Sequence, residues 1–284
     1  MSIVVTGATG HLGRLVVEQL LEQVPAGEIT AVVRDEAKGA DLAARGVRIA
    51  VADYNAPETF DGLLAPGDKV LLISGNEITK DRAVQHQVVI DAAKAAGVAL
   101  LAYTSAPGTL NVRLTDPHRA TEKALLASGL PYSLLRNGWY HENYTENLAP
   151  VLAHDAVVAA AGDGRVSSAA RADYAAAAVA VLTGEGHENT TYELGGDEAW
   201  GFAEYAAELS RATGREIAYR SVSVPELEAI LTGAGLPEAL VTVFAEVDQA
   251  IERGDLVVSG GELSRLIGRP TTPLAVAVEA ALKD

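Results

Sequence analysis

The stretch IVVTGATGHLG, Ile3–Gly13, decides the fold. A β-branched apolar run is followed at once by Gly7, Gly10 and Gly13, and then by a segment with helical periodicity. In such a strand–turn–helix unit the first glycine permits a sharp turn, the second lets the backbone approach a pyrophosphate, and the third allows close packing of helix on strand. The N–H groups at the start of the helix then face the phosphates. The stretch predicts a dinucleotide-binding unit, with a tight glycine turn that binds nothing as the alternative.

The following residues repeat this alternation of short apolar strands and amphipathic helices. Strands are expected at 2–6, 28–34, 47–53, 68–74, 98–105 and 131–137, and helices at 11–24, 37–46, 82–97 and 117–129. Nearly uninterrupted apolar strands separated by helices predict a parallel sheet with both faces covered. Because the crossovers in such sheets are right-handed, we expect an α/β fold with a doubly wound parallel sheet.

The pattern changes after residue 137. The stretch NGWYHENYTENLAPVL (137–152) is rich in Asn and aromatic residues, and it is followed by an apolar helix at 171–184 and a strand at 190–196. A helix and a strand are expected within 202–223, and residues 224–284 are expected to be mostly helical. We therefore predict a dinucleotide-binding lobe at 1–137 and a mixed region at 138–284. The latter completes the sheet and forms a smaller, mainly helical substrate lobe, and the lack of a flexible seam favours closely joined lobes.

Composition narrows the classes of partner. The 284 residues carry a net charge of −16 and include no cysteine. An acidic surface repels nucleic acid and anionic lipid, so neither a nucleic acid nor a membrane is expected as a partner. Disulfides, thiol catalysis and cysteine metal sites are excluded, the histidines lack metal-ligand spacing, and no metal is predicted. With neither a leader pattern nor an apolar run of ~18 residues, a cytoplasmic protein is expected.

The end of the second predicted strand, VVRDE (32–36), bears on the choice of dinucleotide. An arginine at this position binds a 2′-phosphate, whereas an acidic residue binds both ribose hydroxyls. Arg34 is the first polar residue after Val33, and its planar guanidinium suits a phosphate. The sequence therefore favours NADPH, with NADH as the alternative through Asp35 and a solvated loop charge as the alternative for Arg34.

Two further strand ends carry candidate ligands for the dinucleotide. Asp53 ends the third strand and is expected to accept from the adenine amino group. Ser74, Gly75 and Asn76 follow the fourth strand, where small residues let the backbone approach the ribose and pyrophosphate. Open α/β sheets bind their ligands at the carboxyl ends of the parallel strands. The shared location of these residues therefore supports their prediction as cofactor ligands.

Motifs spread over almost the whole chain carry a family resemblance. They are TGATGHLG (6–13), VVRDEAKGADLAARG (32–46), VADY (51–54), IDAAKAAGV (90–98), AYTS (102–105), LLRNGWYHENY (134–144), AAGDGRVSSAARADYAAAA (160–178), YELGGDEAW (192–200) and LIGRPTTPL (266–274). Together they resemble the NmrA-like branch of the atypical short-chain dehydrogenases/reductases, and within it the type 2 NAD(P)H:quinone oxidoreductases. The resemblance implies a Rossmann fold, NADPH as cofactor and a quinone as substrate.

The resemblance also implies which residues contact NADPH. With Asp53 added from the strand-end argument, the predicted cofactor-binding residues are Gly7, Ala8, Thr9, Gly10, His11, Leu12, Arg34, Asp53, Ser74, Gly75, Asn76, Asn137, Gly138, Trp139, Tyr140, His141 and Glu142.

One expected catalytic motif is missing. Short-chain dehydrogenases typically donate a proton from the tyrosine of Tyr-x-x-x-Lys, and none of the six lysines here has a tyrosine four residues before it. Lys123 lies in the expected helix with Arg119 in the place of the tyrosine. Lys123 is predicted as a catalytic residue that bonds the nicotinamide ribose, with a solvated helix lysine as the alternative.

Quinone chemistry accounts for the missing acid. A ketone that accepts a hydride becomes a strongly basic alkoxide, whereas a quinone becomes a phenolate whose conjugate acid has a pKa of ~10. Reduction then depends mainly on orienting two flat rings. We expect Trp139, Tyr140 and Tyr144 to stack on the quinone and Tyr140 or His141 to donate a proton, with Tyr140 the predicted catalytic residue. The alternative is that Trp139 and Tyr140 only pack between the lobes.

Three functions remain in competition on the sequence alone. The first is NADPH-dependent reduction of a quinone by hydride transfer. The second is a non-catalytic NADP(H)-binding redox sensor or regulator of the NmrA type, which also fits the absent tyrosine. The third is an isomerase or reductase acting on another conjugated carbonyl. The end-to-end resemblance favours the first, and a homodimer is left open as the assembly.

Overall fold

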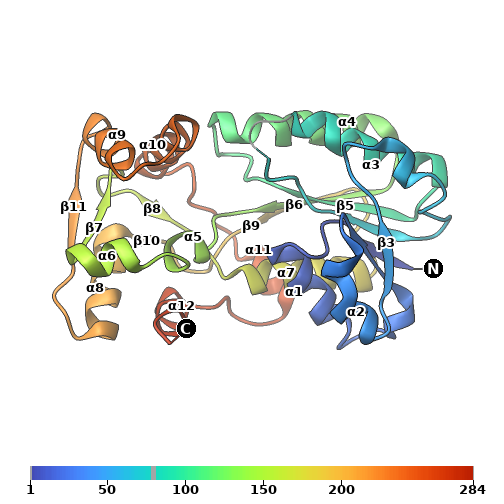
Figure 1. The fold of residues 1–284 in the computed structure, drawn as a ribbon, viewed down its shortest axis with the longest axis horizontal. Helices are drawn as coiled ribbons and strands as arrows, with labels where there is room; N and C mark the ends of the chain where they lie inside the picture. The colour runs from blue at the N-terminus through green and yellow to red at the C-terminus, as the bar shows by residue number, and fades with distance from the viewer. Residues whose placement is uncertain (1, 78–80, 284) are drawn as a thin grey trace. The chain divides into compact units, whose positions relative to one another are not determined.

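A parallel sheet organises the first part of the computed structural model, which describes residues 2–77 and 81–283. Across those residues, seven strands form one sheet in the order β3-β2-β1-β4-β5-β6-β9 (Figure 1). Their bounds are β1 Ile3–Val5, β2 Ile29–Val33, β3 Arg48–Val51, β4 Lys69–Leu72, β5 Leu100–Ser105, β6 Tyr132–Asn137 and β9 Thr190–Leu194. Each strand predicted from the sequence is present, and the doubly wound fold is confirmed.

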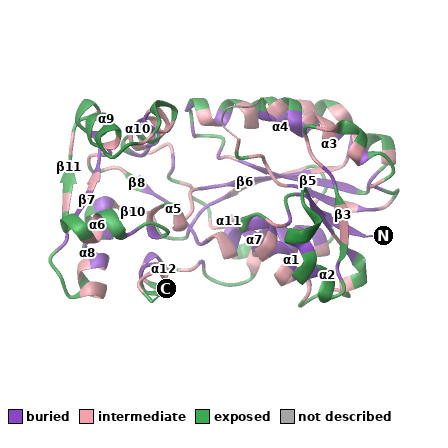
Figure 2. Cartoon of the chain, in the orientation of Figure 1, coloured by how far each residue is buried: buried purple, intermediate pink, exposed green. Residues whose placement is uncertain are grey.

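Helices cover both faces of this sheet. They are α1 His11–Leu20, α2 Ala40–Ala44, α3 Arg82–Ala96, α4 Asp116–Ser128 and α7 Arg171–Thr183. Figure 1 shows α3 and α4 on one face and α1 and α7 on the other. With both faces covered, the central strands are buried, as Figure 2 shows, which explains their uninterrupted apolar sequences.

The strand order creates a topological switch point beside β1. The chain moves from β1 to β2 and β3 on one side, and then from β4 to β5 and β6 on the other. Residue Ile3 of β1 lies in register with Ile29 of β2 and with Lys69 of β4, all in parallel pairing. Open α/β sheets bind ligands at the carboxyl ends of the strands at such a point, which is where the glycine loop leaves β1.

The chain divides into two compact units. Unit 1 comprises Met1–Ala106, Asp116–Asn137 and Arg171–Tyr192, and unit 2 comprises Pro107–Thr115, Gly138–Ala170 and Glu193–Asp284. One boundary falls at the predicted junction between residues 137 and 138. The chain returns to unit 1 with α7, and the segment after β5 belongs to unit 2.

Unit 2 holds two small sheets and several helices. Its strands are β7 Ala156–Ala159, β8 Arg165–Val166, β10 Trp200–Gly201 and β11 Ala218–Ser221, and β7 pairs in parallel with β11 while β8 pairs antiparallel with β10. Its helices are α5 Glu142–Thr145, α6 Ala149–His154, α8 Phe202–Thr213, α9 Val224–Gly233, α10 Glu238–Glu252, α11 Glu262–Ile267 and α12 Leu274–Ala281. The apolar core of this unit includes an aromatic cluster in which Tyr144 packs on Trp200, Phe202 and Tyr205.

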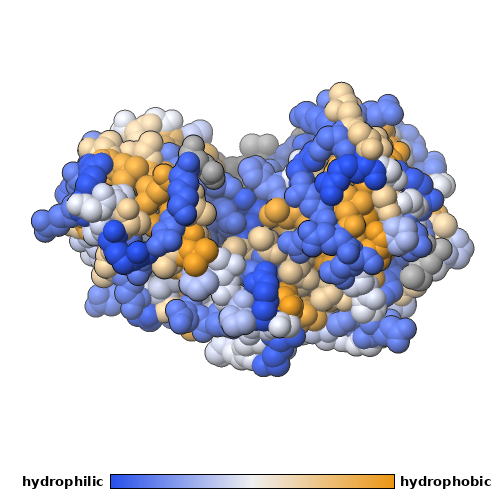
Figure 3. Space-filling model, turned by 90° about the horizontal axis from the view of Figure 1, so that it is seen from below, coloured by the Kyte–Doolittle hydropathy of each residue, from blue (hydrophilic) through white to orange (hydrophobic). Residues whose placement is uncertain are grey.

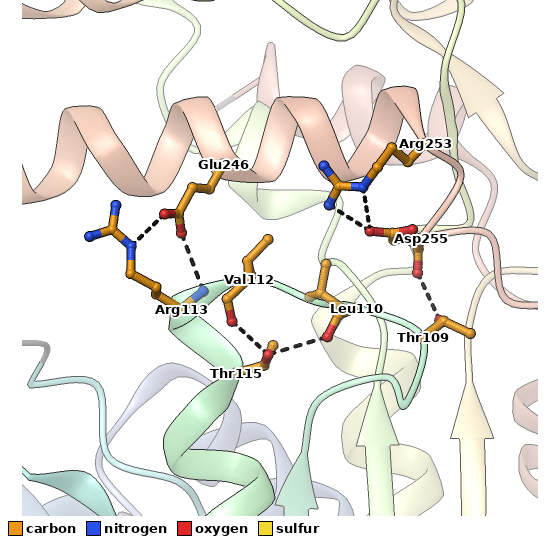
Figure 4. A network of polar contacts seen from close by, with 8 residues as sticks. All are labelled: Thr109, Leu110, Val112, Arg113, Thr115, Glu246, Arg253 and Asp255. Atoms are coloured by element: carbon orange, nitrogen blue, oxygen red, sulfur yellow. Dashed lines mark hydrogen bonds and ion pairs between the residues drawn. The ribbon is translucent and has the colours of Figure 1, made fainter.

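The segment after β5 is tied to α10 within unit 2 (Figure 4). The hydroxyl of Thr109 donates to the carbonyl of Asp255 over 2.8 Å. The side chain of Arg113 pairs with Glu246 of α10, whose carboxylate also accepts from the Arg113 amide. The hydroxyl of Thr115 closes the turn by donating to backbone carbonyls of the same segment. These bonds explain why 107–115 belongs to unit 2 although the segment interrupts the sheet unit in sequence.

Two helix predictions need correction. The helix predicted at 11–24 ends at Leu20, and residues 21–24 form a turn. The helix predicted at 37–46 is a 3-10 turn over Glu36–Gly39 followed by the short α2. Asp35 caps this turn, and Gly39 packs against Ile49 and Val33, so the chain is drawn tightly onto the sheet before α2 begins.

The surface mixes apolar and polar residues. On the face drawn in Figure 3, hydrophobic residues lie in separate groups bordered by hydrophilic ones. Within residues 2–77 and 81–283, every helix is too short or too polar to cross a bilayer.

Candidate cofactor site

The glycine loop forms the anion-facing end of α1. Gly7 has φ +61°, a left-handed conformation that favours glycine, and its carbonyl accepts from the Gly10 amide over 2.9 Å. Gly10 precedes the first turn of α1, and in the described chain neither a side-chain cap nor an acidic residue satisfies that turn. The N–H groups and the positive end of the helix dipole are therefore suited to an anion.

The spacing of the three glycines has a steric explanation. A Cβ on Gly13 would lie 2.2 Å from the carbonyl oxygen of Gly7 and 2.8 Å from the Cα of Ala8, so only glycine fits. This confirms that Gly13 permits the close approach of α1 to the loop. A Cβ on Gly10 would meet only the Gly7 carbonyl oxygen, at 3.3 Å, so a small shift of the loop would accommodate a side chain at Gly10.

Arg34 and Asp35 occupy different environments at the end of β2. Arg34 is largely exposed, and its Nη1 lies 2.9 Å from Oε1 of Glu77. The carboxylate of Asp35 accepts from the Ala37 amide over 3.0 Å and caps the following turn. Asp35 thus has a local structural role, whereas Arg34 presents a guanidinium to solvent. This arrangement favours Arg34 as the residue that distinguishes the two dinucleotides.

Buried polar side chains hold the segment after β4. The amide of Ser74 donates to Oγ1 of Thr104, and the amide of Gly75 donates to Nε2 of His86, each over 2.9 Å. Nη1 of Arg82 donates to the carbonyl of Gly75 over 3.2 Å. Three side chains, one from β5 and two from α3, therefore fix the backbone of two predicted cofactor-binding residues.

His86 is held in one neutral tautomer. Because the Gly75 amide can only donate, Nε2 of His86 is the acceptor and the proton lies on Nδ1, which is 2.8 Å from Oγ1 of Thr121. The hydroxyl of Thr121 donates in turn to the carbonyl of Pro117. Burial lowers the pKa of His86 to about 3, and the charges of His118 and Arg82 add to the decrease. Burial likewise lowers the pKa of His118 to about 3.

Because the pKa values of His86 and His118 are lowered in the folded protein, we expect the protein to lose stability in acid. The unfolded chain takes up a proton on each near pH ~6.5, whereas the folded protein does so only near pH 3. Their contribution to the free energy of unfolding is complete above pH ~6.5 and is lost as the pH falls towards 3, by up to about 1.4 kcal/mol per pH unit for each histidine. Urea unfolding at several pH values between 7 and ~4 measures this slope.

The substitution His86→Gln measures how much His86 contributes to the pH dependence of the free energy of unfolding. In His86→Gln the amide oxygen can still accept from Gly75 but does not titrate, so we expect a shallower slope than in the unmodified protein. His154→Gln is the matched control, because His154 is exposed on α6. An unchanged slope in His86→Gln would contradict the assignment.

A partly buried ion pair joins the end of β6 to α4 and, through Ser105, to the end of β5. Arg136 contacts Glu122 through two bonds, Nε to Oε1 at 2.9 Å and Nη2 to Oε2 at 2.7 Å. The hydroxyl of Ser105 donates to the same carboxylate over 2.6 Å. Sequence reasoning missed this group because Glu122 reads as one more charge in a polar helix. The network fixes the carboxyl edge of the sheet beside α4.

Lys123 and Arg119 lie on the exposed side of α4. Nη1 of Arg119 pairs with Oδ1 of Asp116 one helical turn earlier, at 3.1 Å. Lys123 is exposed. A catalytic role for Lys123 stays a prediction.

Two other predicted ligands, Asp53 and Asn137, lie at the ends of β3 and β6. Oδ1 of Asp53 accepts from the amide and the side chain of Asn55, at 2.9 and 2.8 Å, and so shapes the turn after β3. Asn137 is buried at the end of β6. The predicted adenine contact of Asp53 and the cofactor contact of Asn137 stay predictions.

The aromatic segment that follows β6 belongs to unit 2. The carbonyl of Trp139 accepts from the Ala169 amide over 3.1 Å, and Tyr140 forms a parallel bridge with Ala169. The amide of Gly138 donates to Leu194 over 2.7 Å. The Trp139 side chain packs against the core of this unit, whereas Tyr140 is only partly buried. Stacking of these residues on a quinone stays a prediction.

His141 is a buried connector of unit 2. Its Nε2 must donate to the carbonyl of Thr272, 2.9 Å away, so Nδ1 accepts from the hydroxyl of Ser168 over 2.8 Å. The same hydroxyl accepts from Nε1 of Trp200. The imidazole is 1% exposed and positions three segments, and a cofactor contact by His141 or by its neighbour Glu142, at the start of α5, stays a prediction.

One basic residue near the glycine loop was missed. Nη1 of Arg171 lies 3.5 Å from Nδ1 of His11, the first residue of α1. Arg171 starts α7, in the RADY stretch that gives no local signal of a contact with α1. An acidic protein that binds a polyanion requires local positive charge, and Arg171 supplies it beside the amino end of α1.

These features define a class of protein. A glycine loop before an uncapped helix, at the switch point of a doubly wound sheet, is the arrangement of a Rossmann-type dinucleotide-binding protein. Residues 7–185 match the NAD(P)H-binding family, and the chain belongs to that family.

Known relatives extend the match over the full chain. The sequence is 46% identical to quinone oxidoreductase 2 of Escherichia coli over 278 residues, 97% of each chain. The structure matches the E. coli NADPH-dependent quinone oxidoreductase complexed with NADPH with a TM-score of 0.95, 45% identity, and coverage of 99% of this chain and 100% of that one. It also matches the Citrobacter triphenylmethane reductase complexed with NADP(H), with a TM-score of 0.94, 40% identity, and coverage of 99% and 100%. The family resemblance drawn from the sequence is confirmed.

Proposed function

We propose that this protein is an NADPH-dependent quinone reductase. The observation that carries the proposal is the 46% identity, over 97% of both chains, with E. coli quinone oxidoreductase 2. The glycine loop supports it independently, because the space above Gly10 and the uncapped start of α1 suit a pyrophosphate.

The residues of unit 1 fit NADPH in chemical type. The amides at the start of α1 would bind the pyrophosphate, Arg34 would bind the 2′-phosphate, and the fixed backbone of Ser74 and Gly75 would line the ribose side. NADPH, when bound, supplies a hydride to the quinone. NADH is the weaker alternative, because Asp35 already caps a turn.

The quinone needs little acid from the protein. After hydride transfer it is a phenolate, which water or a phenol protonates readily because its conjugate acid has a pKa of ~10. We assign the aromatic face that contacts the quinone to Tyr140, which is partly buried, since Trp139 packs into the core of unit 2. The ring N–H at Nε2 of His141 is donated to the carbonyl of Thr272 and the ring is buried, so we assign proton donation to Tyr140 or to water.

NADPH consumption with a panel of benzoquinones and naphthoquinones tests the proposal. We expect NADPH absorbance to fall only when a quinone is present, with one hydroquinone formed for each NADPH consumed. Tight NADPH binding without turnover on any quinone would overturn the reductase and leave the redox sensor of the NmrA type. Turnover restricted to other conjugated carbonyls would favour an isomerase or reductase that acts on those compounds. A free quinone as partner and the cytoplasm as location belong to the same proposal.

Tyr140→Phe is expected to keep roughly a third or more of the turnover with quinones. The aromatic face remains, and the phenolate product has little need of an acid. Tyr140→Ala should weaken quinone use more strongly through lost contact area, seen as a raised KM. Steady-state kinetics measure both variants, and a fall in turnover by ~100-fold or more in Tyr140→Phe would restore an acid-catalysed mechanism.

A further inference from the structure

An ion pair spans the carboxyl end of β1. Arg34 directly follows β2, Glu77 follows β4, and β1 lies between these two strands in the sheet. The bond of 2.9 Å between Nη1 of Arg34 and Oε1 of Glu77 therefore connects the loops on either side of the strand that leads into the glycine loop. These residues are 43 positions apart in the sequence.

The same guanidinium is the proposed site for the 2′-phosphate. A carboxylate on Nη1 partly neutralises Arg34 and occupies one of its donors, and it carries the same sign of charge as the phosphate. The side chains of Arg34 and Glu77 are 67% and 29% exposed, so water weakens their attraction and a phosphate dianion can displace the carboxylate. NADH has no 2′-phosphate and does not enter this competition.

We propose that Glu77 is a specificity-determining residue that competes with the 2′-phosphate of NADPH for Arg34. This inference rests on the proposed function, in which Arg34 binds that phosphate. Glu77 weakens the binding of both NADPH and NADP⁺ and so favours release of the oxidised cofactor. Glu77 leaves the binding of NADH unaffected. It therefore reduces the preference for NADPH over NADH that Arg34 creates.

The dissociation constants of NADPH, NADP⁺ and NADH for single and double variants test the proposal. We expect Glu77→Gln to tighten the binding of NADPH and NADP⁺ by roughly three- to fivefold and to change NADH by less than about twofold. The matched control is Glu58→Gln, which removes an equal charge from an exposed position of unit 1 and should leave all three constants within about twofold. Circular dichroism checks that each variant is folded.

The double variant separates this inference from the proposed function. In an Arg34→Ala background, Glu77→Gln should no longer tighten NADPH binding, because no guanidinium remains to compete for. If Arg34→Ala weakens NADPH but Glu77→Gln leaves it unchanged or weakens it, Glu77 does not compete and the inference is wrong. If Arg34→Ala itself leaves NADPH binding intact, the phosphate site assigned under the proposed function is wrong, and the inference fails with it.

Discussion

Gly10→Val is expected to abolish NADPH binding while the protein stays folded. The backbone of Gly10 has φ −77° and ψ 168°, an extended conformation open to any residue, and an added Cβ would meet only the Gly7 carbonyl oxygen at 3.3 Å. The valine methyl groups would instead fill the space that a pyrophosphate needs at the amino end of α1. Calorimetric titration should show NADPH affinity lowered by about a hundredfold or more, with a normal circular dichroism spectrum.

Gly13→Ala is the informative comparison. Its Cβ would lie 2.2 Å from the Gly7 carbonyl oxygen, so the loop and α1 must separate, and we expect the free energy of unfolding to fall by about 1–3 kcal/mol. Within one loop, Gly10 is thus expected to matter for NADPH binding and Gly13 for the stability of the fold. Unaltered NADPH binding by Gly10→Val would mean that the loop is structural only.

The sheet was predictable because each strand carries its own local signal. Runs such as Ile3–Val5 and residues 70–72 are buried on both faces, so their sequences are continuously apolar and stand out between helices. The strand β7 was missed because Ala156–Ala159 is only four residues long and follows a region without clear periodicity. Its partner β11 lies about sixty residues later, a separation that local periodicity does not detect.

The residues of the site were predictable from the sequence only where they follow a predicted strand. The glycine loop and Arg34 follow predicted strands directly, so their place at the carboxyl edge could be inferred from the sequence. Glu77 and Arg171 could not, because each approaches the loop from another part of the chain. The role of His86 in fixing Gly75 was also hidden, since a buried histidine and a solvated one look alike in a helix. Long-range pairing depends on the topology, which periodicity alone does not define.

Arg34→Ala is expected to weaken NADPH binding by roughly ten- to over a hundredfold, the loss of a charge-assisted contact of about 1.5–3 kcal/mol. Affinity for NADH should change little, because its ribose carries no phosphate. The ratio of the NADPH and NADH dissociation constants is therefore the decisive measurement.

Arg34→Lys and Arg45→Ala sharpen this prediction. Lysine keeps the charge but loses the planar fork, so NADPH affinity should lie between those of the unmodified protein and Arg34→Ala. Arg45 is exposed at the end of α2, and Arg45→Ala removes the same charge from unit 1 at another position, so both cofactors should bind as before. Equal losses for NADPH and NADH in Arg34→Ala would show that Arg34 contacts a part common to both. The choice of cofactor would then have to lie elsewhere at the carboxyl edge of the sheet.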